Sequence, residues 1–181
     1  MDTQVEDYIK SKKYKEKFEE LRIDDTSIHD FIELSKSEDD KVRVRAIYAL
    51  GKIAEKGFTS YKEEIIDTLV RGLRDSCDWV RGHAAHFLGR INHPEEKIIE
   101  LFQDSCPWVR HKSAEAAGLI GMINPHFAEK AIPGLLRLLK DRSSYVQYIA
   151  LEAVKKIADN NQEICKEVKD YLKSVLHEPR N

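Results

Sequence analysis

A valine that recurs four times in one register constrains the fold of this chain more than any other feature. It stands at positions 42, 80, 109 and 146, at intervals of 38, 29 and 37 residues. Around two of these valines the chain nearly repeats itself, as DSCDWVRGHAAHFLGRI (75–91) and DSCPWVRHKSAEAAGLI (104–120). Self-similarity with a period of about 20–50 residues indicates an array of repeated structural units.

The residues after each valine predict a helix that is buried on one side. Apolar side chains stand 4, 7, 8 and 11 positions after the valine in all four copies, with Ser113 as the polar exception. At about 100° per residue these offsets form one stripe of an α-helix. Gly51, Gly89 and Gly118 stand at offset 9, on an adjacent face. Glycine costs about 1 kcal/mol against alanine inside a helix, so we expect two helices to approach closely at these positions.

Amphipathic segments between the valine helices supply their packing partners, beginning near residues 26, 60, 94 and 125. Ser60 and Glu63 have the spacing of a capping box at one of these starts. Gly57 and Gly121 stand where helix ends call for a left-handed residue. Residues 4–20 and about 161–176 are amphipathic, which indicates an N-terminal cap over residues 1–23 and a C-terminal cap with a frayed tail over residues 161–181. The prediction is therefore a single all-α repeat domain over residues 1–181, with four helix pairs in residues 24–160.

Composition agrees with a helical protein and excludes several classes. Charged residues make up 34% of the chain, whereas Gly and Pro number only eight and five. A net charge of -2 gives no global case for nucleic-acid binding. The start, MDTQVEDYIK, is not a signal peptide, and no apolar run reaches the length of a membrane span. Three cysteines without a C-x-x-C pair indicate a reduced, cytoplasmic protein.

Each unit reads as a helix that ends in Asp, a tight turn, and a helix that opens with Val-Arg and continues to L-G-x-I. This pattern, over about residues 24–160, resembles HEAT repeats, in particular the short form of phycobilin-lyase-like proteins. The resemblance implies an α–α superhelix, a solenoid of about four helix pairs with capping helices at both ends. It also implies a ladder of ion pairs and hydrogen bonds along the stack, formed by Asp75, Arg81, Asp104, Arg110 and Asp141.

The resemblance places the Val-Arg helices on the concave side, where repeat proteins bind their partners. Offsets 3, 6 and 10 point away from the apolar stripe there, although a merely solvated face would have a similar composition. The basic and aromatic residues of this candidate strip are Arg45, Tyr48, Lys52, His83, His86, Arg90 and Lys112. An aromatic residue precedes the valine in three units, and it either seals the edge of the solenoid or stacks on a ligand; these residues are Trp79, Trp108 and Tyr145.

No set of residues supports catalysis, so we predict neither an enzyme nor a cofactor. His83 and His86 lie one helical turn apart near His111, but no carboxylate completes a metal site. HEAT-repeat hydroxylases that bind iron use His-Glu pairs, where this chain has Gly82-His83 and His111-Lys112. Bilin lyases share the repeat, but nothing marks a tetrapyrrole pocket. Cys77 and Cys106 occupy one register and are interpreted as turn residues.

The leading hypothesis is a non-catalytic scaffold that binds a protein or peptide on its concave face. The basic strip favours an acidic segment as the partner, and no membrane is involved. The alternative is a nucleic-acid-binding HEAT-like protein, with phosphates on the same basic positions. A metal-dependent or lyase-type enzyme of the HEAT-repeat group is the third hypothesis. The oligomeric state is left open.

Overall fold

The computed structural model describes residues 1–57 and 61–176, without the side chains of residues 167 and 172–176. Ser60 of the predicted capping box and the tail residues 177–181 lie outside this part. All regular structure in the described residues is helical, which confirms the predicted fold class. The chain forms two compact units, Met1–Ile91 and Asn92–Asn181. That both act as one domain stays a prediction.

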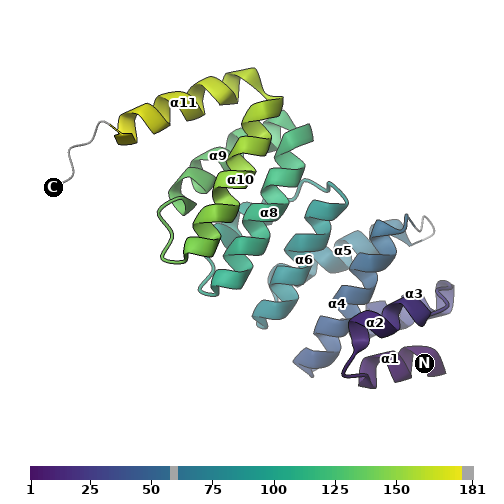
Figure 1. The fold of residues 1–181 in the computed structure, drawn as a ribbon. Helices are drawn as coiled ribbons and strands as arrows, with labels where there is room; N and C mark the ends of the chain where they lie inside the picture. Colours follow the sequence, from purple (N-terminus) through teal and green to yellow (C-terminus); the bar gives the residue numbers. More distant parts are fainter. Residues whose placement is uncertain (58–60, 177–181) are drawn as a thin grey trace. The chain divides into compact units, whose positions relative to one another are not determined.

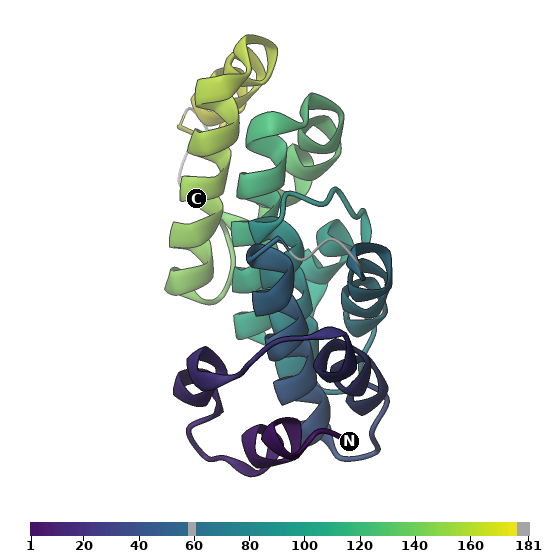
Figure 2. The same ribbon diagram turned by 90° about the vertical axis from the view of Figure 1, so that its right-hand side faces the viewer.

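The first unit is built on two neighbouring valine helices, α4 and α6, with α5 behind them (Figure 1). Its N-terminal helices lie around α4, with α2 and α3 on opposite sides (Figure 2). Asp24 begins α3 with a capping box, because its carboxylate accepts the backbone N–H of Ser27 and the Ser27 hydroxyl accepts the backbone N–H of Asp24. The elements of the unit are α1 (Thr3–Lys10), α2 (Tyr14–Lys17), the 3-10 helix η1 (Phe18–Glu20), α3 (Asp25–Leu34), α4 (Asp40–Glu55), α5 (Lys62–Gly72) and α6 (Asp78–Arg90).

The second unit repeats this arrangement with α8 and α10 side by side, α9 behind them, and α11 across the end of α10 (Figure 1). Pro107 and Pro125 stand in the first turns of α8 and α9, where a missing N–H costs no helical hydrogen bond. The elements of this unit are α7 (Lys97–Glu100), η2 (Leu101–Gln103), α8 (Pro107–Ile123), α9 (Pro125–Leu138), α10 (Ser144–Asn160) and α11 (Gln162–Leu176).

The predicted apolar stripe forms the core of both units. Of its members, only Val42 and Ile91 are less than fully buried. Gly57 ends a helix with a φ of 78°, as predicted. The same expectation for Gly121 is wrong, because α8 continues through it to Ile123. A Cβ on Gly121 would lie 2.8 Å from the side chain of Ile157, so this glycine serves close packing instead.

Glycine at offset 9 brings neighbouring valine helices together, as its position in the sequence predicts. A Cβ on Gly51 would lie 2.1 Å from the ring of Phe87, which belongs to α6. A Cβ on Gly118 would lie 2.9 Å from the backbone Cα of Ala153 on α10. Real side chains do not show contacts this short. The spacing of α4 from α6, and of α8 from α10, therefore depends on the missing methyl group.

An arginine after the valine joins consecutive repeats through their turns. In the first unit the Arg43 guanidinium donates two hydrogen bonds to the Asp75 carboxylate, at 2.8 and 2.9 Å. In the second unit Arg110 donates the same pair to Asp141, at 2.7 and 2.9 Å. Hydrogen bonding from Arg110 lowers the pKa of Asp141, which keeps the carboxylate ionised. Each pair therefore ties one repeat to the next at a fixed register.

The arginines that follow the valines also bind the backbone of their own turns. Arg81 donates to the backbone carbonyls of Asp75 and Ser76, and Arg110 donates to those of Asp104 and Ser105. The side chain of each turn aspartate accepts the backbone N–H two residues on, which makes an Asx turn. Gln147, which replaces the arginine in α10, still donates to the carbonyl of Asp141.

The Gly51–Phe87 contact predicts that Gly51→Ala lowers the stability of the wild-type protein but not that of a Phe87→Ala variant. Gly51→Ala should destabilise the wild-type protein by about 1–3 kcal/mol, because the added methyl group overlaps a buried ring. In a Phe87→Ala background the ring is gone, and the better helix propensity of alanine should make Gly51→Ala neutral or stabilising by up to about 1 kcal/mol. Urea unfolding of the four variants measures both values. Equal costs in the two backgrounds would show that Phe87 does not set the helix spacing.

The Arg110–Asp141 ion pair is partly buried, so removing one partner should cause a large loss of stability. Arg110→Met should destabilise the protein by about 3 kcal/mol, because Asp141 loses its charged partner and two turn carbonyls lose their donor. Arg142→Met is the matched control on an exposed neighbour, and it should change stability by less than about 0.5 kcal/mol. Thermal unfolding separates the two variants. Similar losses of stability in the two variants would show that the Arg110–Asp141 pair does not stabilise the fold.

Candidate functional site

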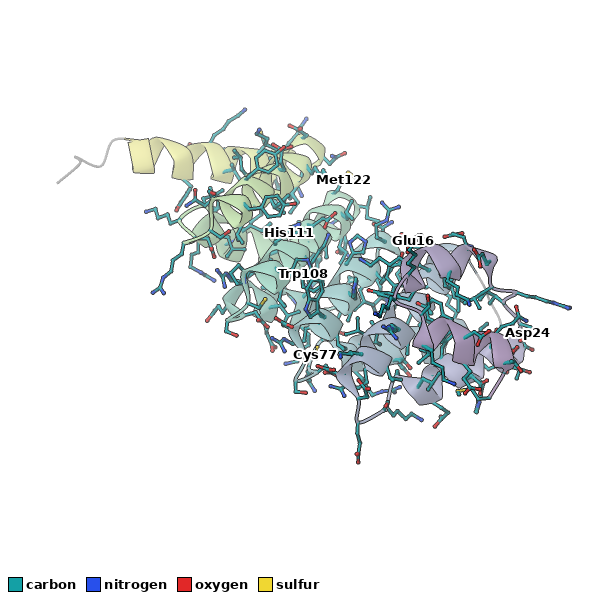
Figure 3. The ribbon with its side chains drawn as sticks, turned by 60° about the horizontal axis from the view of Figure 1, so that its bottom comes forward. Glu16, Asp24, Cys77, Trp108, His111 and Met122 are labelled. Carbon is teal, nitrogen blue, oxygen red and sulfur yellow. The ribbon has the colours of Figure 1, made fainter. Side chains whose placement is uncertain are left out.

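The turns place a set of distinctive side chains at the N-terminal ends of the valine helices. Cys77 and Cys106 are the N-cap residues of α6 and α8, with extended backbone, which agrees with their interpretation as turn residues. Cys77 lies at one end of the first unit, and Trp108 lies at the start of α8 (Figure 3). Trp79, in the first turn of α6, is 52% exposed, although a large apolar ring is usually covered.

The N-terminal segment, residues 3–20, covers much of the predicted strip on α4. The hydroxyl of the buried Tyr8 donates to the backbone carbonyl of Arg45 at 3.1 Å. The Arg45 guanidinium in turn donates to the carbonyl of Ile9. Phe18 is buried, and Lys56 lies over its ring and pairs with Glu19. Arg45 therefore works partly inside the molecule, as a link between α4 and the segment.

A continuous series of ring contacts runs from this segment to α6. The ring of Tyr48 lies edge-on to Tyr14, Phe18, His83 and Phe87, with centroids 5.4–6.4 Å apart. His83 also contacts the ring of Trp79, at 6.4 Å. Burial raises the pKa of Tyr14 and of Tyr48, so both phenols stay neutral. His83 is buried, unlike the solvent-facing position that its offset suggested.

Lys52 and Arg90 of the predicted strip meet at a single carboxylate. Glu55 accepts hydrogen bonds from Lys52 at 3.0 Å and from Arg90 at 2.7 Å. Burial opposes ionisation of Glu55, but these two hydrogen bonds outweigh it and lower its pKa. This end of the strip is therefore a partly neutralised ion network rather than a row of open cations.

A surface pocket of about 410 Å³ opens where α2, α4 and α6 meet. Two aromatic rings line it, Tyr14 from the N-terminal segment and Trp79 from α6. Lys41 and Arg45 contribute positive charge, and Asp40 contributes negative charge. A volume of this size accepts one or two side chains of a partner. The structure thus brings Arg45 and Trp79 of the candidate residues into one site; the complete lining is Tyr14, Asp40, Lys41, Val44, Arg45, Cys77 and Trp79.

The other candidate residues occupy different environments. His86 is half-buried, and its ring contacts Phe87. In the second unit Lys112 pairs with Glu115 at 2.8 Å, and the exposed Tyr145 lies 4.6 Å from the ring of the buried His111. Trp108 is half-buried.

Two observations bear on other functions. Within the described residues, no group of three or more His, Cys, Asp or Glu side chains could hold a metal ion. No described helix is long and apolar enough to span a membrane.

Several residues of the pocket escaped the sequence reasoning. Tyr14 lies outside the repeats, and Val44 stands at offset 2 of its valine helix, outside both the apolar stripe and the candidate strip, so only the fold brings them to Trp79. The repeat register could have identified Lys41, because it precedes Val42 as Trp79 precedes Val80. Arg43, which lies outside the pocket but binds Asp75, could also have been identified, since it follows Val42 as Arg81 follows Val80.

Comparison with known proteins identifies the family. A family model described as HEAT repeats matches residues 28–99 and 95–181, so the chain belongs to the HEAT-repeat family. A search of curated proteins finds no match.

Solved structures of helical repeat proteins are similar in fold. An engineered protein is 27% identical with a TM-score of 0.65, over 82% of this chain and 69% of its own. A designed armadillo repeat protein in complex with the peptide (KR)4 is 18% identical with a TM-score of 0.65, over 98% of this chain and 92% of its own. Kap121p is 18% identical with a TM-score of 0.75, but the 97% of this chain that aligns corresponds to only 21% of Kap121p. The two likenesses at 18% identity concern the fold alone.

The charges around the pocket predict how Trp79 responds to small ions. In a Trp108→Phe variant, where Trp79 is the only tryptophan, iodide should quench fluorescence roughly twofold or more better than caesium at low ionic strength, because the cations concentrate anions. Lys41→Glu should reduce the difference between iodide and caesium quenching, because it replaces a cation of the pocket with an anion. Trp79→Phe, which leaves only Trp108, supplies the control. Equal quenching by both ions would argue against a positive pocket.

Proposed function

We propose that this HEAT-repeat chain is a non-catalytic scaffold that binds a segment of a partner protein at the pocket between Tyr14 and Trp79. The observation that carries the proposal is the exposed indole of Trp79, held at the mouth of a pocket with a second aromatic wall. Tryptophan and arginine dominate binding energy at protein interfaces when a partner covers them. Both line this pocket.

The class of protein supports the same function. Repeat arrays commonly bind extended partners along the surface of their stacked helices. A designed armadillo repeat protein of similar fold was solved with a peptide, and Kap121p was solved bound to Pho4p. Cys77, Cys106 and Cys165 are free thiols, which fits the proposed cytoplasmic location. Nucleic acid is the competing ligand, because aromatic rings and cations also bind bases and phosphates.

The proposal predicts that Trp79 carries much of the affinity for a native partner. Trp79→Ala should weaken capture of that partner about tenfold or more, since an interface tryptophan contributes about 2 kcal/mol or more. Tyr148→Ala is the matched control, because Tyr148 is also an exposed aromatic residue but lies on α10. Quantitative co-purification from native extract, with and without nuclease, provides the measurement. Unchanged capture by the Trp79 variant, or loss of all capture on nuclease treatment, would contradict the proposal.

A further inference from the structure

The pocket is not formed by repeats alone, because the N-terminal segment supplies one of its walls. Tyr14 follows α1 in the chain, and its ring reaches the pocket by leaning on Tyr48 at 5.4 Å, edge-on. The Arg45 guanidinium lies 5.5 Å from the centroid of the same ring. Tyr8 also lies edge-on to Tyr14, at 6.1 Å, and Lys15 lies over its ring at 5.9 Å, so rings and cations hold Tyr14 from several directions. Tyr14 lines the pocket together with Val44, Cys77 and Trp79.

The N-terminal segment also shows what the neighbouring surface of α4 accepts. It seats the rings of Tyr14 and Phe18 against Tyr48. Directly after Phe18, Glu19 pairs with Lys56 at 3.1 Å. This part of the molecule therefore already holds an aromatic side chain followed by a carboxylate, with ring edges and cations as the receiving groups. The open pocket offers the same two kinds of group, rings and cations, to a ligand from outside.

Both signs of charge lie near the pocket, but cations outnumber carboxylates in its lining and in the run that contains Tyr14. Tyr14 lies inside the run KSKKYKEK, residues 10–17, which contains five lysines and one acidic residue. Lys12, Lys13 and Lys15 of this run are exposed. Lys41 and Arg45 line the pocket itself, against the single carboxylate of Asp40. At short range these cations favour a carboxylate on the ligand and disfavour a basic peptide.

The arrangement favours an acidic peptide over a nucleic acid. The residues before Lys41 are Glu38, Asp39 and Asp40, and all three are exposed. A phosphate backbone carries a charge at every nucleotide and gains affinity from a continuous track of cations. Such a track would be interrupted by this acidic run, whereas a single ligand carboxylate needs only Lys41 and Arg45, the two cations that line the pocket and outnumber Asp40 there.

We infer that the partner segment inserts an aromatic side chain between Tyr14 and Trp79 and places an adjacent carboxylate on Lys41 and Arg45. This inference rests on the proposed function and adds the chemistry of the ligand to it. The aromatic ring replaces water against two rings and two apolar side chains, and the carboxylate gains charge-assisted hydrogen bonds. The N-terminal segment is then part of the binding site as well as a cap for α3 and α4.

Three synthetic peptides test the inference on the full-length chain. They contain Asp-Phe-Asp, Asp-Ala-Asp or Lys-Phe-Lys between identical glycine-serine flanks. The protein is labelled with 5-fluorotryptophan, so Trp79 and Trp108 give two fluorine resonances, which Trp79→Phe assigns. Asp-Phe-Asp should shift the Trp79 resonance in a saturable way and leave Trp108 unchanged. The other two peptides should bind at least tenfold more weakly.

Charge reversal at an exposed residue completes the test. Lys41→Glu should lower the affinity for Asp-Phe-Asp at least fivefold. It should also reduce the ratio between the affinities for Asp-Phe-Asp and Lys-Phe-Lys. Lys62→Glu, an exposed position on α5 away from the pocket, is the matched control and should bind as the wild type does. Both variants should keep the wild-type unfolding temperature, which shows that any loss is not a loss of folding.

The outcomes that would overturn the inference are specific. Equal affinities for the three peptides, a preference for Lys-Phe-Lys, or no binding of Asp-Phe-Asp at millimolar concentration would do so. A thymidine octamer that shifts Trp79 more tightly than any peptide, with a steep salt dependence, would assign the pocket to nucleic acid. If Trp79→Ala still loses its native partner while the peptides show no preference, the proposed function stands and only the ligand chemistry falls. If Trp79→Ala keeps its partner, the proposed function itself falls.

Discussion

The hydrogen-bonded clamp between an arginine of one repeat and an aspartate of the next is the contact on which the candidate site depends. Arg43 grips the Asp75 carboxylate with two nitrogens while it also binds the carbonyls of its own turn. Asp75 in turn accepts the backbone N–H of Cys77 and so shapes the start of α6. Because this start carries Trp79, the clamp fixes where an exposed indole stands relative to α4. A lysine could not replace Arg43, since a single ammonium group lacks the planar fork that reaches a carboxylate and two carbonyls together.

Close helix approach complements the clamp at the other end of each pair. Gly51 lies eight residues after Arg43 and lets α6 approach until the Phe87 ring fills the space of the missing side chain. The two constraints act at different heights of one helix, so α6 can neither slide nor tilt freely against α4. This rigidity gives the pocket a defined width, although its walls come from three separate elements. Preorganised walls reduce the entropy that a ligand loses on binding.

The repeat register allowed the helices, their buried stripe and the close approach at Gly51 and Gly118 to be predicted, because each depends on residues near one another in sequence. The site was less predictable, because it depends on where the N-terminal segment lies. Arg45 and Tyr48 have the offsets of solvent-facing residues, yet residues 3–20 pack against both. His83 has such an offset too, but Tyr48, Trp79 and Phe87 surround it. Helical offsets describe a face of one helix and do not reveal which distant segment covers that face.

The position before each valine shows how one register produces different chemistry. Lys41 and Trp79 share it in consecutive repeats, and the pocket uses the charge of the first and the ring of the second. In the second unit the same position holds Trp108 and Tyr145, and the ring of Tyr145 lies 4.6 Å from that of His111. A strictly periodic array would offer identical side chains along its length and would bind equally well in several registers. Because different residues occupy the same position in successive repeats, a ligand finds only one binding register in which its ring meets an aromatic residue and its carboxylate meets a cation. The specificity proposed for this chain thus arises from departures from the repeat, on a framework that the repeat itself makes rigid.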